Sequence, residues 1–162
     1  CTICHSEGYH LIAKLPVCRT CYFTPAESMR KIGYDVTVEG DVFQGAELEV
    51  NAPPNRDLSI PPTMFGPEDW RTAVRKRLGT DEHQTGHAEF DELVFIGYIE
   101  PETQASLEDE AIRHLIEDLV PHGQLELIGD AARMHIFKRN ARPLDELVLR
   151  LGLLMSRLCE NA

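Results

Sequence analysis

Two cysteine pairs in the first 21 residues constrain this chain more than any other feature. The spacing is C-x2-C-x13-C-x2-C, with Cys1 and Cys4 in the first pair and Cys18 and Cys21 in the second. Zn²⁺ takes four ligands in a tetrahedron, with sulfur at about 2.3 Å. The segment is too short to bury a core, so metal binding would supply its folding free energy, on the order of 10–16 kcal/mol in small zinc peptides. We therefore predict one structural zinc ion held by four thiolates.

This spacing resembles that of zinc ribbons and treble-clef fingers, over about residues 1–33. The 13 residues between the pairs are enough for a short hairpin. Thr24 and Glu27 predict a capping box that begins a helix over about 25–32. A second pair that leads into a helix favours a treble clef, whereas a helix cap placed after Cys21 favours a ribbon. The sequence leaves both open.

Other chemistries of the same cysteines have to be weighed. The run from Cys1 to His5 also reads as C-x-x-C-H, the attachment motif of a c-type haem. A haem attached to Cys1 and Cys4 would leave Cys18 and Cys21 without a ligand to bind. A rubredoxin-like iron site would use all four, and a redox dithiol would need a thioredoxin-like unit that the sequence does not resemble. Four cysteines also close the coordination shell, which is typical of structural rather than catalytic zinc.

Composition and charge narrow the class of protein further. The 162 residues are 43% hydrophobic and 27% charged, which is typical of a globular chain. The net charge is −11, divided into −2 over residues 1–81 and −9 over 82–162, and this balance argues against nucleic-acid binding. No apolar run reaches the roughly 18–20 residues that span a bilayer. Paired cysteines of this kind suit a reducing compartment, so we expect a cytoplasmic protein without a membrane span.

The remaining pattern predicts an α+β fold. Strands come in hairpins rather than in βαβ units, which favours an antiparallel sheet with helices on one face, next to the small zinc module. We expect three segments, 1–33, 34–79 and 80–162. The expected strands are at 36–38, 46–50 and 93–96, the last of them an inner strand. The expected helices are at 67–78 and 106–120, followed by a Leu-rich helix from Pro143 to about Glu160. We also expect a proline-rich loop at 51–67, with a brief extended stretch near Leu58–Ile60, and a hairpin around Gly129-Asp130.

The second half carries a Gly-x-x-x-Phe-Asp element, from Gly86 through Phe90 to Asp91. It precedes the predicted strand, helix, hairpin and terminal Leu-rich helix, up to Leu158. In this order of parts it resembles an uncharacterised bacterial α+β family, some of whose members are membrane-tethered or carry N-terminal zinc ribbons. The resemblance implies a fold and no known activity, and this chain departs from it by lacking a transmembrane segment.

A search for catalytic motifs finds no nucleophile elbow, Walker loop, dinucleotide fingerprint or His-Glu-x-x-His. His83 and His87, with carboxylates nearby, leave a metal-dependent enzyme as one alternative, although Gly86 interrupts any helix that would align them, and we favour a solvated acidic loop. The basic cluster Arg71–Arg77 leaves a second alternative, a nucleic-acid adaptor that also uses the ribbon.

The last helix carries a separate signal. Leu149 and Leu153 lie one turn apart, on the side opposite the predicted core stripe, so they predict an exposed apolar patch for a partner or a second copy. Cys159 reads as a small core residue. The sequence thus favours a non-catalytic, zinc-stabilised protein-interaction or assembly protein, which binds a protein partner or itself.

Overall fold

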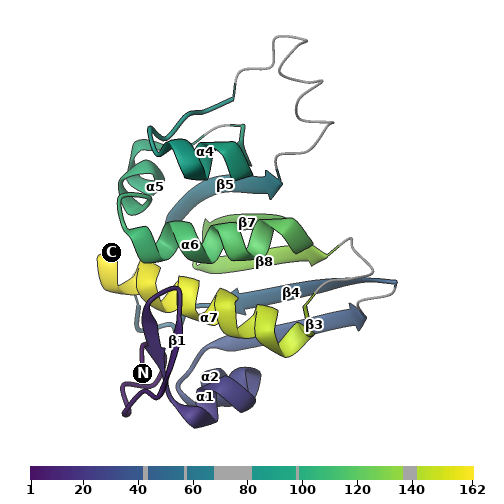
Figure 1. Ribbon diagram of the computed structural model, residues 1–162. Helices are drawn as coiled ribbons and strands as arrows, with labels where there is room; N and C mark the ends of the chain where they lie inside the picture. Colours follow the sequence, from purple (N-terminus) through teal and green to yellow (C-terminus); the bar gives the residue numbers. More distant parts are fainter. Residues whose placement is uncertain (42–43, 57, 68–81, 98, 137–141) are drawn as a thin grey trace.

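The structure is a computed structural model, and it describes residues 1–162 except 42–43, 57, 68–81, 98 and 137–141. It has an α+β fold with a small N-terminal module and a larger sheet (Figure 1). The module contains β1 (His10–Ile12), β2 (Leu15–Val17), α1 (Arg19–Phe23) and α2 (Pro25–Lys31). The rest contains β3 (Asp35–Asp41), β4 (Gly45–Asn51), β5 (Ile60–Pro67), α4 (Ala88–Leu93), β6 (Val94–Ile96), α5 (Pro101–Ser106), α6 (Glu110–Leu119), a 3-10 turn (Val120–His122), β7 (Gly123–Gly129), β8 (Ala131–Ile136) and α7 (Leu144–Asn161).

The larger sheet has six strands in the order β3-β4-β8-β7-β5-β6, and each neighbouring pair is antiparallel. β4 pairs with β8, with Leu48 opposite Met134. β5 pairs with both β6 and β7. The predicted segments 34–79 and 80–162 therefore both contribute strands to the same sheet.

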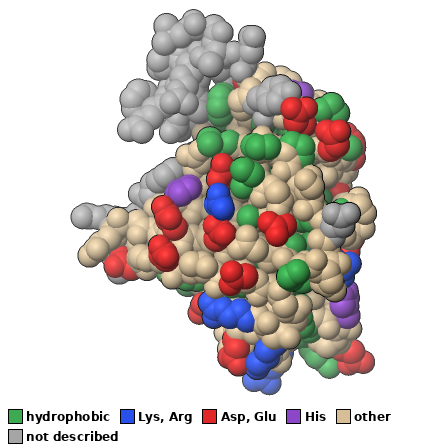
Figure 2. All heavy atoms as spheres, turned by 180° about the vertical axis from the view of Figure 1, so that it is seen from behind, with side chains coloured by type: hydrophobic (Ala, Val, Ile, Leu, Met, Phe, Trp, Pro, Cys, Tyr) green, Lys and Arg blue, Asp and Glu red, His purple; other side chains and the backbone are tan. Residues whose placement is uncertain are grey.

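Helices cover one face of this sheet. α7 packs on β4 and β8, and α6 lies beside α7, as Figure 1 shows. The core between the layers is made of fully buried aliphatic and aromatic side chains, among them Leu48, Phe65, Leu115, Leu119, Leu125, Met134, Leu147, Leu151 and Leu154. The opposite face is open, and Figure 2 shows acidic side chains spread over it around a few basic groups. There Arg133 of β8 forms ion pairs with Glu49 and Glu126.

Several predicted elements are confirmed. The strands at 36–38 and 46–50 form the β3–β4 hairpin, and the final helix begins after Pro143. β7 and β8 form the hairpin predicted around Gly129-Asp130, and Gly129 has a φ of 61°, a conformation that suits glycine in such a turn. The predicted helix over 67–78 falls on residues outside the described ranges.

Three predicted elements differ from the structure. Part of the proline-rich loop is the strand β5, and its pairing with β7 is irregular between Ile60 and Thr63, where Pro61 and Pro62 have no N–H to donate. The predicted inner strand is β6, which lies at the edge of the sheet. The predicted helix over 106–120 is α6, which begins later, at Glu110, while Ser106 is the last residue of the preceding helix α5. Asp109 rather than Ser106 caps α6, and its carboxylate accepts from the amide of Ala111 at 2.9 Å.

The prediction that Leu149 and Leu153 form an exposed patch is wrong. They are 1% and 0% exposed. α7 packs on the sheet along one side and against α1, α2 and α6 along the others, so it has no apolar side left for a partner. Gly152 lies between the two leucines and meets Met29 of α2, which identifies the N-terminal module as part of their cover. Cys159 is buried, as predicted.

Candidate metal centre

The second cysteine pair lies at the start of helix α1. Cys18 is its N-cap residue, and the Cys18 sulfur accepts from the amide of Cys21 at 3.4 Å. The first turn of a helix leaves amide N–H groups without intrahelical partners, and a thiolate is a suitable acceptor for them. Local structure thus brings both sulfurs to one end of a five-residue helix.

The first pair lies on a tight turn that is fastened to the β1–β2 hairpin. The amide of His5 donates to the carbonyl of Cys1 at 2.8 Å, and His5 has a φ of 60°. The amide of Thr2 donates to the carbonyl of Pro16 in β2 at 2.8 Å. This contact places the first pair beside the strand that leads directly into Cys18.

The hairpin turns at Ala13 and Lys14, which both have positive φ, at 48° and 65°. Two successive positive-φ residues form the turn type that matches the twist of a two-residue hairpin. Neither is glycine, so both residues hold a conformation that is uncommon for residues with a side chain. Gly8 is used for close approach instead, because a Cβ there would lie 2.8 Å from the Cβ of Pro16.

The four sulfurs meet. One ligand atom each from Cys1, Cys4, Cys18 and Cys21 lies within 4.8 Å of every other, and the sulfurs of Cys4 and Cys18 are 3.6 Å apart. Sulfurs on a tetrahedral Zn²⁺ would be about 3.8 Å apart, given a metal–sulfur distance of about 2.3 Å. All five cysteines of the chain are free thiols, so no disulfide competes for these atoms. The set can hold one metal ion.

The electrostatics of the cluster favour a bound cation. Burial works to raise the pKa of Cys18, but hydrogen bonds from the Ser6 hydroxyl and the Cys21 amide hold that pKa at about 6. Burial, together with the neighbouring thiols of Cys4 and Cys18, raises the pKa of Cys21 to about 12. Four thiolates in this space repel one another, and a divalent cation removes that penalty.

Contacts of several kinds join the module to the rest of the chain. Met29 of α2 is fully buried against Gly152 of α7. The hydroxyls of Tyr34 and Ser156 form a buried hydrogen bond of 3.0 Å. The Lys14 ammonium forms an exposed ion pair of 2.7 Å with Glu110 of α6. The metal module thus packs on the helical layer.

The predicted capping box of α2 is absent. Thr24 is the N-cap residue but makes no side-chain cap, and its hydroxyl donates instead to the carbonyl of Thr20 in α1. Glu27 forms an ion pair of 2.7 Å with Lys31, one turn later. The preceding helix α1 supplies an acceptor that the sequence pattern did not reveal.

The loop at 82–91 does not gather a second metal site among the residues that the structure describes. The Nε2 atom of His83 lies 2.7 Å from the side-chain oxygen of Gln104. The Nε2 atom of His87 faces Glu108 at 3.5 Å and Arg113 at 3.4 Å. Within the described ranges, the cysteine set is the only group of three or more potential ligands that converge.

The Gly-x-x-x-Phe-Asp element has a structural role in that loop. The carboxylate of Asp91 accepts from the amide and the hydroxyl of Thr85, and from the amide of Gly86 at 3.0 Å. Phe90 is 1% exposed and anchors α4 in the core. The element therefore closes a loop onto the first turns of α4, which explains its residue types without any chemistry.

An exposed aromatic surface on the metal module escaped the sequence analysis. Leu11 is 75% and Phe23 is 62% exposed. The ring of His10 stacks on Tyr22 at 4.2 Å, and Tyr22 meets Phe23 edge to face. The available signal was the short length of both elements, since a three-residue strand and a five-residue helix cannot bury every aromatic residue they carry. We call Leu11, Tyr22 and Phe23, with the neighbouring Tyr9, the aromatic tip.

Other predicted features are not tested by the described residues. The Arg71–Arg77 cluster lies within 68–81, outside the described ranges. None of the described helices has the length and apolarity needed to cross a membrane. Comparison with protein-family models, with curated proteins and with solved structures finds no match for this chain. The resemblance of residues 86–158 to a bacterial family therefore stays a prediction.

Proposed function

We propose that this chain is a non-catalytic protein-interaction or assembly protein whose N-terminal module is folded around one structural zinc ion. The convergence of four cysteine sulfurs within 4.8 Å carries this proposal. A closed set of four thiolates leaves no coordination position for a substrate or a water, so the ion acts on the fold rather than on a reaction. The order of parts, a cysteine turn, a hairpin and a helix that begins at Cys18, is that of a treble clef.

Because Leu149 and Leu153 are buried, the interaction surface is expected on the metal module rather than on α7. The aromatic tip is a set of exposed apolar side chains on a small unit, and exposed apolar surface of this kind is typical of protein contacts. Tyrosine and phenylalanine bring contact area at little cost in side-chain entropy. Metal binding supports the interaction indirectly, because the hairpin and α1 that present the tip are held by the cysteines.

Metal content and association are measured separately. Native mass spectrometry of the protein loaded with Zn²⁺ is expected to show one ion per chain. Replacement of Leu11 or Phe23 by Asp is expected to weaken self-association or partner binding in analytical ultracentrifugation, while zinc content stays at one. Leu93→Asp is the matched control, since Leu93 is 56% exposed on α4, outside the module. If the tip variants and the control associate alike, the tip is not the interface.

A further inference from the structure

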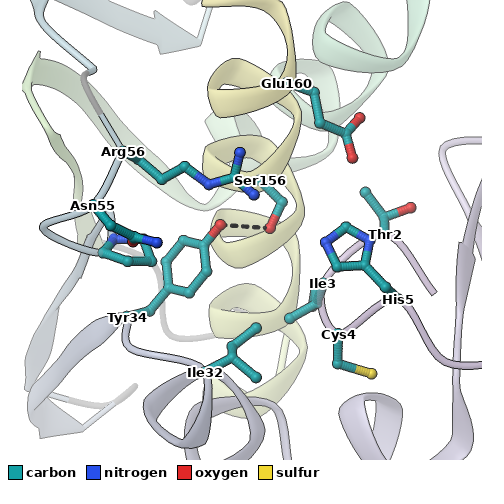
Figure 3. Close-up of a pocket in the computed structure, with 11 residues that line it drawn as sticks. Thr2, Ile3, Cys4, His5, Ile32, Tyr34, Asn55, Arg56, Ser156 and Glu160 are labelled. Carbon is teal, nitrogen blue, oxygen red and sulfur yellow. Dashed lines mark hydrogen bonds between the residues drawn. The ribbon is translucent and has the colours of Figure 1, made fainter.

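A cleft lies at the junction of four segments of the chain. Its walls come from the first cysteine turn, the residues that follow α2, the loop after β4 and the last turns of α7. Its volume is about 180 Å³. We call it the junction cleft, and Figure 3 shows its lining. The lining residues are Thr2, Ile3, Cys4, His5, Ile32, Tyr34, Pro53, Asn55, Arg56, Ser156 and Glu160.

The charges of the junction cleft are of both signs and are not paired with each other. The ion pairs found among the described residues include none for Arg56. Glu160 forms an ion pair with Arg157 through Oε2, at 2.7 Å, which leaves its Oε1 for another donor. Arg56 and Glu160 enter the cleft from different segments, one from the loop after β4 and one from α7 (Figure 3).

The remaining lining combines apolar and polar groups. Ile3, Ile32 and Pro53 provide apolar wall, and Asn55 and His5 provide exposed polar groups. The Tyr34 and Ser156 hydroxyls are bonded to each other and fix the side of α7 that faces the cleft. Burial raises the pKa of Tyr34, and the positive charge of Arg56 opposes that shift, so the guanidinium acts electrostatically on this wall. Drug-sized ligands occupy about 300–1,000 Å³, so this cleft suits a much smaller one.

We propose that the junction cleft binds a small zwitterion of the α-amino acid class, with its carboxylate on Arg56 and its ammonium group on Glu160. A carboxylate alone would meet the repulsion of Glu160, and a cation alone would meet that of Arg56. A molecule that carries both charges a few ångströms apart satisfies both groups. The proposal rests on the proposed metal centre only in that the first cysteine turn forms one wall.

The test uses three matched probes on the full chain loaded with zinc and labelled with ¹⁵N. L-alanine carries both charges, N-acetyl-L-alanine carries only the carboxylate, and L-alaninamide carries only the ammonium group. L-alanine is expected to shift the amide signals of Thr2, His5 and Asn55. The other two probes are expected to bind about tenfold more weakly or worse, because each loses one charged hydrogen bond.

Two variants and two controls locate the site. Arg56→Gln and Glu160→Gln are each expected to weaken L-alanine binding about tenfold. Arg142→Gln, just before the start of α7, and Glu89→Gln, on α4, are expected to leave L-alanine binding unchanged. The proposal is overturned if L-alanine and N-acetyl-L-alanine bind equally well. It is also overturned if the two control variants lose as much L-alanine binding as Arg56→Gln and Glu160→Gln. If the protein binds one zinc ion but L-alanine shifts no amide signals, the amino-acid site is overturned and the metal centre stands. If L-alanine binds to a protein that takes no zinc, the metal centre is overturned and the amino-acid site stands.

Discussion

Met29 of α2 occupies the space that a side chain at Gly152 of α7 would need. A Cβ at Gly152 would lie 2.0 Å from the Met29 sulfur and 2.8 Å from its terminal methyl carbon. Met29 is fully buried, so it has little room to move aside. This contact joins the metal module to the helix that crosses the sheet, and it places the module directly over the side of α7 that carries Leu149 and Leu153.

Gly152→Val is therefore expected to destabilise the protein. Overpacking of a filled core costs about 1–3 kcal/mol, and valine has no helix-propensity gain large enough to offset it. The free energy of unfolding, measured by urea titration, gives the size of the loss. The matched test is the same substitution in a Met29→Ala background, where the space over residue 152 is vacated and the loss is expected to shrink. Equal losses in both backgrounds would mean that the two residues do not press on each other.

The cysteine cluster predicts a sharp contrast between two buried cysteines. Cys21→Ser is expected to abolish stoichiometric zinc binding, because a serine hydroxyl is a poor zinc ligand, and to lower the unfolding temperature of the module. Cys159→Ser removes a thiol of similar burial that lies outside the cluster. Its zinc content, measured by native mass spectrometry, is expected to stay at one. Loss of zinc in both variants would contradict a site made of the first four cysteines.

A chelator is expected to reproduce the effect of Cys21→Ser in the unaltered protein. Removal of the ion leaves a hairpin and two short helices with few buried residues of their own, and the contact of Met29 with Gly152 then has to hold the module alone. We expect a lower unfolding temperature after chelation and recovery when Zn²⁺ is added back. An unchanged melting curve with the metal demonstrably removed would show that packing on α7 suffices.

The cysteine site could be predicted because the spacing of the cysteines alone determines which residues can bind one ion. It also found the β7–β8 hairpin, since Gly129 marks a turn that few other residues tolerate. These are local rules, in which the residues that decide the outcome lie within about 20 positions of one another. The aromatic tip and the junction cleft were not visible, because both depend on which segments pack together.

The incorrect predictions also concern features that depend on which distant segments pack together. An apolar residue on the far side of a helix is predicted to be exposed unless the segment that covers it is known. On α7 that side packs on α2, which lies more than 100 residues earlier in the chain and meets α7 through Met29 and Gly152. In the short apolar run around β6, Val94 and Ile96 are buried although β6 is an edge strand, so an apolar run did not reveal which strands lie beside it. β5 escaped notice because its prolines argue for a loop, while the irregular register at Ile60–Thr63 accommodates them.

The buried hydroxyl pair of Tyr34 and Ser156 makes a second link between the segments around the module and α7. Tyr34→Phe leaves the Ser156 hydroxyl buried without its partner, and we expect a loss of about 1–2 kcal/mol in the free energy of unfolding. Ser156→Ala in the Tyr34→Phe background removes the orphaned group, so the double variant is expected to be no less stable than Tyr34→Phe. A double variant that loses the sum of both single changes would show that the hydroxyls act independently.

Asp109 connects α6 to the last turn of α7 and predicts a dependence on pH. Burial works to raise its pKa, but hydrogen bonds from Asn161, Arg157 and the Ala111 amide outweigh burial and lower it. Since the folded-state pKa lies below the unfolded value of about 3.9, the carboxylate stabilises the fold above that pH, and the contribution is lost as pH falls through the folded-state pKa.

Asp109→Ala removes both the helix cap and the ion pair of 2.6 Å with Arg157. We expect it to cost about 1–2 kcal/mol of unfolding free energy at pH 7, the usual range for a lost N-cap. The difference from the unaltered protein is expected to narrow below about pH 4, where the carboxyl group begins to protonate. Asp145→Ala, in the first turn of α7, is the control that should show little narrowing. A gap that stays constant from pH 7 to about pH 3 would mean that the charge of Asp109 contributes nothing and that only its packing does.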